Sequence, residues 1–132
     1  MAEDRRLVAV ILEVSDLGRS VALYRDGFGL DLHPDDNAVD DRWIGGIHAE
    51  ISWRKGAYLH FALYPAKGQP TSGVQIGLSV DNIEVAHAAA IPGGARVLHE
   101  PRVEPWGRSA RYEDFDGNVI ELTQHTKLSA NE

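Results

Sequence analysis

Two polar side chains in this sequence lie inside apolar, strand-like triplets. His60 lies within Leu59-His60-Phe61, and Glu121 lies within Ile120-Glu121-Leu122. Because successive side chains of a strand point to opposite faces, each polar side chain faces away from its two apolar neighbours. Imidazole nitrogen and carboxylate oxygen are strong ligands for a divalent cation, and both also hydrogen-bond organic ligands. A catalytic cation needs at least three good donors and an open position, so this pair alone predicts a polar cleft surface.

Aromatic and basic residues in the last third of the chain could form the wall of a ligand site. Trp106 follows Pro105, which restricts the backbone ahead of the indole ring. A Trp or Tyr ring suits stacking against a flat ligand, and Tyr112 lies nearby. Arg108 and Arg111 could pair with a carboxylate on the ligand. For each aromatic residue the alternative is packing in the core.

A second candidate wall lies in the acidic stretch around position 40. Trp43 ends the polar segment Asp40-Asp41-Arg42-Trp43, and we expect it either to contact a ligand or to contact a second subunit. The aspartates between positions 35 and 41 are expected to be a solvated loop. Alternatively, they attract the positive charge of a planar ligand. The charge of the ligand therefore stays open, and Trp53 is expected to pack in the core.

What the sequence lacks argues against several functional classes. There is no cysteine, so disulfides, thiolate metal sites and cysteine nucleophiles are excluded. The formal net charge of −7 argues against nucleic acid, whose binding needs a basic surface. No apolar run could span a membrane, and the charged N-terminus lacks the apolar segment of a secretory signal, so we expect a cytoplasmic protein. The motifs of serine hydrolases, phosphate-binding loops and zinc hydrolases are also missing.

The elements that position these residues occur twice along the chain. Each half begins with a buried strand, a helix cap and a glycine that ends the helix: Leu7–Val14, Ser15-Asp16 and Gly27, then Val74–Val80, Asn82 and Gly93. The offset between the halves is 66 residues at both the cap and the glycine. An equal offset is typical of a duplicated unit. The offset of 61 between His60 and Glu121 fits a loop of different length.

Three strand candidates follow each helix: Asp31–His33, Gly46–Trp53 and Ala57–Tyr64, then Arg96–Val103, Ser109–Glu113 and Asn118–Gln124. The 132 residues are expected to form a single domain, with a first βαβββ repeat over 7–64 and a second over 74–124. Residues 65–73 are the expected linker, and 125–132 a tail. The predicted class is α+β: two helices over two curled, mixed sheets that surround a cleft.

With these elements in place, several motifs carry a family resemblance. They are Val14-Ser15-Asp16-Leu17, Gly27-Phe28-Gly29-Leu30 and Asp114-Phe115-Asp116-Gly117-Asn118-Val119-Ile120-Glu121-Leu122. In these, the chain resembles the vicinal oxygen chelate superfamily, which includes glyoxalase I, extradiol dioxygenases, fosfomycin-resistance enzymes and bleomycin-resistance proteins. Glu104-Pro105-Trp106-Gly107-Arg108 is similar to a segment of the bleomycin-resistance proteins whose tryptophan lines their cleft. The resemblance implies a glyoxalase/bleomycin-resistance-like fold over residues 7–124, a fold that hosts many chemistries.

The resemblance also implies four metal-ligand positions, two in each repeat. They fall on Ala9, His60, Gln75 and Glu121. Alanine offers no donor atom and glutamine is a weak, neutral one, so we expect no cofactor and no catalytic metal. If a divalent metal binds, its ligands are His60, Gln75 and Glu121. In many relatives the two halves of one site come from different chains of a dimer, so His60 and Glu121 could meet across a subunit interface.

These observations predict a homodimer that binds a small aromatic, antibiotic-like molecule in its cleft, without a catalytic metal. The residues expected to bind the ligand are Trp106, His60, Gln75, Glu121, Arg111, Tyr112 and Trp43. The alternative is a metal-dependent lyase, isomerase or dioxygenase of the same superfamily. A third possibility is a dimeric scaffold or regulatory partner that has no small-molecule ligand.

Overall fold

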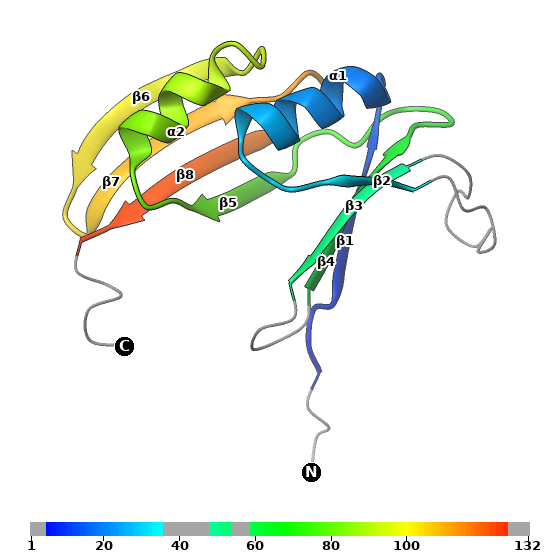
Figure 1. Cartoon of the computed structure of the whole chain (residues 1–132), viewed down its shortest axis with the longest axis horizontal. Helices are drawn as coiled ribbons and strands as arrows, with labels where there is room; N and C mark the ends of the chain where they lie inside the picture. Colours follow the sequence, from blue (N-terminus) through cyan, green and yellow to red (C-terminus); the bar gives the residue numbers. More distant parts are fainter. Residues whose placement is uncertain (1–4, 36–47, 54–58, 127–132) are drawn as a thin grey trace.

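The two halves of the chain fold into two four-stranded sheets, each accompanied by a helix (Figure 1). The structure, a computed structural model, describes residues 5–35, 48–53 and 59–126. The first half contains β1 (Ala9–Val14), α1 (Leu17–Val21), the π-helix η1 (Ala22–Gly27), β2 (His33–Asp35), β3 (His48–Trp53) and β4 (Leu59–Pro65). The second half contains β5 (Gln75–Ser79), α2 (Ile83–Ala90), β6 (Arg96–Glu104), β7 (Gly107–Glu113) and β8 (Val119–His125). No described helix is long and apolar enough to cross a membrane.

Both sheets have the same connectivity. Their strand orders are β1-β4-β3-β2 and β5-β8-β7-β6. In each sheet the first and last strands of the repeat are parallel neighbours, and the remaining pairs are antiparallel. The predicted α+β architecture of two βαβββ repeats with mixed sheets is thereby confirmed. Some element ends differ from the prediction: β2, for example, spans His33–Asp35 rather than Asp31–His33.

The two helix caps are close structural copies of each other. Asp16 has φ −141° and ψ 102°, and Asn82 has φ −140° and ψ 103°. The Asp16 carboxylate accepts a hydrogen bond from the N–H of Arg19, and the Asn82 side chain accepts from the N–H groups of Glu84 and Val85. Both predicted caps are therefore confirmed, and each satisfies helix N–H groups that have no partner within the helix.

The core lies where the helices cover the sheets. Alternate residues of the strands point into it, so Leu12 of β1, Leu63 of β4 and Ile120 and Leu122 of β8 are all buried. Tyr24 of η1 is also fully buried. The residues between them along β1, β4 and β8 face the opposite side of each sheet, which leaves His60 and Glu121 outside the core.

A buried polar network joins the two repeats. The Asp114 carboxylate accepts hydrogen bonds from the Tyr24 hydroxyl at 2.6 Å and from the Asn118 side chain at 3.0 Å. The Asn118 side chain, which is fully buried, also donates to the carbonyl of Thr71 and accepts from the N–H of Val74. Burial, followed by the hydrogen bond to Asp114, raises the pKa of Tyr24. The Asp-Phe-Asp-Gly-Asn turn thus ties the second repeat to the first helix and to the linker.

Candidate ligand-binding site

A cavity of about 960 Å³ lies between the two repeats. Its walls come from the first sheet, the end of η1, the whole of β5 and one side of α2. The lining residues are Val10, Asp26, Gly27, Phe28, Gly29, Leu30, Leu59, Phe61, Val74, Gln75, Ile76, Gly77, Leu78, Ser79, Val80, Asp81, Asn82, Val85, Ala86 and Ala89. Most of these side chains are apolar, and the volume falls within the roughly 300–1,000 Å³ of small-molecule sites.

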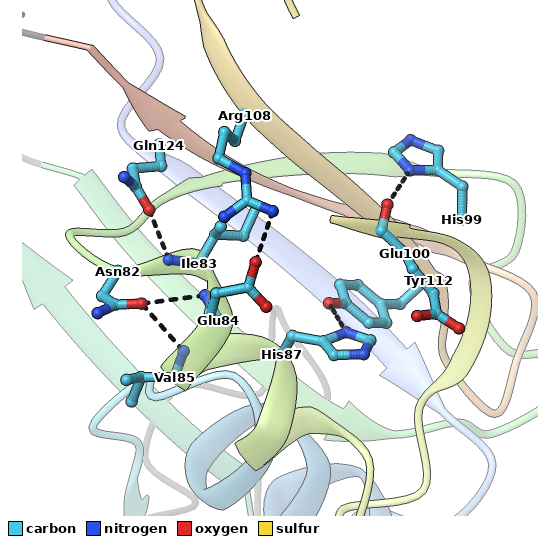
Figure 2. A network of polar contacts seen from close by, with 10 residues as sticks. All are labelled: Asn82, Ile83, Glu84, Val85, His87, His99, Glu100, Arg108, Tyr112 and Gln124. Carbon is cyan, nitrogen blue, oxygen red and sulfur yellow. Dashed lines mark hydrogen bonds and ion pairs between the residues drawn. The ribbon is translucent and has the colours of Figure 1, made fainter. Parts of the chain in front are cut away.

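The helix that forms one wall is held by polar contacts to the second sheet (Figure 2). Arg108 of β7 pairs with Glu84 at 2.5 Å, and the hydroxyl of Tyr112 lies 2.7 Å from Nδ1 of His87. The side chain of Gln124 accepts a hydrogen bond from the first N–H of the helix. These contacts fix α2 against the sheet and thereby fix the side of the cavity that it lines.

This arrangement corrects one sequence-based assignment. Tyr112 was expected to line the cleft, but its side chain is fully buried beneath α2, with its ring 5.5 Å from that of Phe28. Its position in β7 opposite Ile120 places it on the core side of the sheet. Burial, with a smaller contribution from Glu100 and Glu84, raises the pKa of Tyr112 to about 12. Tyr112 is thus a core residue and presents no surface to a ligand.

The charged groups of the cavity are both carboxylates. Asp26 lies at the end of η1, and Asp81 precedes α2. Asp26 is paired with Arg25, whose hydrogen bond lowers the pKa of that carboxyl. None of the described residues that line the cavity is Lys, Arg or His. The cavity therefore favours an uncharged or positively charged ligand over an anion.

His60 lies outside this cavity, on the other face of the first sheet. Its Nδ1 is 2.8 Å from the hydroxyl of Ser52, and its Nε2 is 3.8 Å from the carboxylate of Glu50. Ala9 of β1 is the direct neighbour of His60 in the sheet. The imidazole is half-buried and oriented by polar neighbours from β3, as expected for a cleft residue that contacts other protein groups.

Glu121 occupies the equivalent face of the second sheet. It pairs with Arg111 of β7, its neighbour in the ladder, at 3.5 Å. Gly77 of β5 is its neighbour on the other side. Of the predicted ligand residues, the structure therefore brings Glu121 and Arg111 together, while His60 makes its contacts in the other sheet. Gln75 is the predicted residue that lines the cavity.

The four positions that the family resemblance assigns to metal ligands do not fit a resident metal in this chain. Ala9 supplies a methyl group, and the carboxylate of Glu121 is paired with Arg111. Across the described ranges, no three His, Asp or Glu side chains gather closely enough to hold an ion. A divalent cation would thus find only separate, partly occupied donors here.

The predicted tryptophan walls lie away from the cavity. Trp106 is 41% exposed in the turn between β6 and β7, and its ring centroid lies 5.1 Å from that of His125. Gly107 next to it has φ 151°, and a Cβ there would lie 2.1 Å from the carbonyl oxygen of Gln124. The Trp-Gly pair thus reflects a close approach of the turn to β8. Trp43 lies outside the described residues.

Sequence reasoning did not find most of the cavity. It treated β5, α2 and Phe28 as elements of the fold, although each of them contributes to the walls. One signal was available: the alanines on α2, Ala86 and Ala89, are too small to cover a neighbouring strand. The position of β5 at the edge of its sheet could be inferred only from the topology.

Comparison with known proteins agrees with this fold. A family model described as the Glyoxalase/Bleomycin resistance protein/Dioxygenase superfamily matches residues 6–122. TnmS3, an antibiotic binding protein from Streptomyces sp. CB03234, is 26% identical with a TM-score of 0.69, over 96% of this chain and 100% of that one. A glyoxalase/bleomycin resistance protein from the same organism is 28% identical with a TM-score of 0.65, over 90% of this chain and 100% of that one. No curated protein matches the chain significantly.

Proposed function

The chain belongs to the Glyoxalase/Bleomycin resistance protein/Dioxygenase superfamily, and on this premise we propose that it binds and sequesters an aromatic, antibiotic-like small molecule without a catalytic metal. The observation that carries the proposal is the apolar cavity of about 960 Å³ between the repeats. Such a volume accommodates a drug-sized molecule, and a few polar groups at its margin would fix the orientation of the ligand. The similarity to an antibiotic binding protein supports the same class of ligand.

The proposal includes a homodimer. In one chain, His60 faces Ser52 and Glu50, and Glu121 faces Arg111. A second copy that brings these two polar faces together would enclose a ligand between them, with Trp106 as a stacking surface at the rim. Trp43 and Gln75 remain proposed ligand contacts in that arrangement.

The proposal is tested by titrating the intrinsic tryptophan fluorescence with a panel of planar aromatic antibiotics. We expect saturable quenching by at least one of them. Ala89→Leu adds bulk at the cavity wall and should weaken that binding, whereas Ala88→Leu, on the same helix but outside the lining, should not. Both changes introduce a strong helix former, so neither should disturb α2. Absence of any saturable response across the panel, or an equal effect of the two variants, would contradict the proposal.

A further inference from the structure

One wall of the cavity is an unpaired strand edge. β5 is the terminal strand of its sheet and pairs only with β8 among the described strands. The carbonyl of Val74 accepts a hydrogen bond from Val119, and the N–H of Val80 donates to Thr123. Because backbone groups of a strand alternate in direction, those of the odd-numbered residues between them point away from β8. These residues are Gln75, Gly77 and Ser79, and all three line the cavity.

The equivalent edge in the first repeat is covered. The offset of 66 residues makes Glu13 of β1 the counterpart of Ser79. The N–H of Glu13 donates to the Thr71 hydroxyl at 2.8 Å, and the N–H of Thr71 donates to the carbonyl of Glu13 at 2.7 Å. The linker thus acts as a short partner for β1. No described segment does the same for β5, so its outward N–H and C=O groups face the cavity.

The sequence of β5 does not protect this edge. Natural proteins usually shield free strand edges with charged residues, proline, bulges or a covering segment. The outward positions here are an amide, a glycine and a hydroxyl. A Cβ at Gly77 would meet no atom within 4 Å, and Gly77 does not have a positive φ, so neither crowding nor backbone conformation requires glycine. Glycine within a strand often marks a place where another backbone approaches closely.

From this edge and its apolar surroundings, we propose that the ligand carries an extended amide backbone, which adds to β5 as a further strand. The proposal rests on the proposed function and names the chemical class of the ligand: a peptide or peptide-like compound. Backbone hydrogen bonds to Gln75, Gly77 and Ser79 would supply the main-chain contacts, and alternate side chains would enter the apolar cavity. Asp26 and Asp81, the charged residues of the lining, would favour a positively charged end group on that compound.

The first experiment alters the ligand and leaves the protein unchanged. The probe is the peptide amide Lys-Val-Tyr-Val-Phe, compared with two analogues that carry N-methyl groups on its odd-numbered or its even-numbered residues. Alternate N–H groups of an added strand face the edge that it joins, so we expect one analogue to bind about tenfold more weakly and the other to bind like the parent. Calorimetric titration measures all three. Equal binding of the two analogues and the parent would overturn the proposal.

The second experiment alters the edge. Gly77→Pro removes the outward N–H, and proline is tolerated where the N–H faces away from the ladder. Gly77→Ala keeps the N–H and serves as the matched control. We expect the proline variant to lose about tenfold in affinity for the parent peptide and the alanine variant to retain it. In the wild-type protein the peptide should slow amide exchange at Gln75, Gly77 and Ser79, and unchanged exchange there at saturation would overturn the proposal even if the proline variant fails to fold.

The two proposals fail in different ways. Saturable binding of non-peptide aromatic antibiotics with no binding of the peptide would overturn the strand-addition proposal and leave the proposed function standing. Pairing of the β5 edge with a second copy of the chain, detected as amide protection that depends on protein concentration, would also overturn it. If neither class of compound binds, both proposals fall.

Discussion

Gly27 and Gly93, which are 66 residues apart, pack backbone against backbone where the two repeats meet: a Cβ on Gly93 would lie 3.2 Å from the Cα of Gly27. Each glycine follows or ends the helical segment of its own repeat. The glycines predicted to stop the helices thus have a second role, because they allow the two helical segments to approach each other closely.

Gly93→Ala should therefore destabilise the protein. The added methyl group would contact Gly27 at 3.2 Å and the side chain of Leu23 at 3.3 Å, closer than an ordinary van der Waals contact. We expect a loss of about 1–3 kcal/mol, the usual cost of overpacking. Gly68→Ala is the control, since a Cβ there meets nothing within 4 Å. Urea denaturation measures both, and equal stability of the two variants would show that the close approach is tolerant.

Tyr24→Phe should also destabilise the protein. It removes the hydroxyl that donates to Asp114 at 2.6 Å and leaves a buried carboxylate with one partner fewer. A loss of about 1–3 kcal/mol is expected. A double-mutant cycle with Asp114→Asn isolates the contact, because the effect of Tyr24→Phe should shrink when the carboxylate is already absent. Additive effects of the two changes would mean that the hydrogen bond contributes little.

The two buried tyrosines predict a loss of stability in alkaline solution. A tyrosine is neutral when protonated, and the folded-state pKa lies above the ordinary value of 10.0 for Tyr24 and at about 12 for Tyr112. Above pH 10.0 the unfolded chain releases protons that the folded chain retains, so the free energy of unfolding falls as the pH rises. The decrease should approach about 1.4 kcal/mol per pH unit for each tyrosine.

Denaturation below and above pH 10.0 measures this decrease, and phenolate absorbance shows whether the two groups ionise only on unfolding. In the Tyr24→Phe variant the decrease should be shallower, since one of the two groups is removed. Stability that stays constant up to pH 12 would contradict the prediction.

Trp106→Ala should weaken ligand binding without unfolding the protein. Under the proposed function the indole ring is a stacking surface, so the affinity for a responsive aromatic antibiotic should fall about tenfold. Because the side chain is 41% exposed, the change in the free energy of unfolding should stay below about 1 kcal/mol. Val103→Ala, at an 82% exposed position near the same turn, is the control. Unaltered affinity in Trp106→Ala would remove the stacking role.

Metal analysis tests the proposed absence of a catalytic ion. Protein purified without a chelator from medium containing manganese, nickel and zinc should hold far less than one equivalent of metal, because Ala9 supplies no donor. Treatment with EDTA should leave antibiotic binding unchanged. Near-stoichiometric metal that depends on both His60 and Glu121 would instead favour the metal-dependent lyase, isomerase or dioxygenase.

The repeat and its caps could be predicted from sequence because both depend on local chemistry. Asp16 and Asn82 cap their helices through hydrogen bonds to nearby N–H groups, and strand alternation correctly placed His60 and Glu121 outside the core. The continuation of the first helix as a π-helix from Ala22 to Gly27 gave no such signal. Element ends and caps are set by neighbouring residues, so sequence spacing is sufficient to locate them.

The candidate site was harder to predict because it depends on contacts between distant segments. Tyr112 has the same residue type as a cleft-lining tyrosine, and only its register opposite Ile120 shows that it faces the core. The Asp114 network likewise joins Tyr24 to a turn 90 residues away. The cavity itself results from how two sheets and two helices are placed, which the spacing within one segment does not encode.

The single linker that holds β1 through Thr71 has a broader consequence. A tandem duplication joins two identical units by one connecting segment, so that segment can shelter the border of one unit but not of both. The twofold symmetry of the ancestor is broken at that point, and the surplus border is available for recruitment without any loss of internal pairing. In such a molecule a binding function can arise from the geometry of duplication itself, before any side chain has been selected for it.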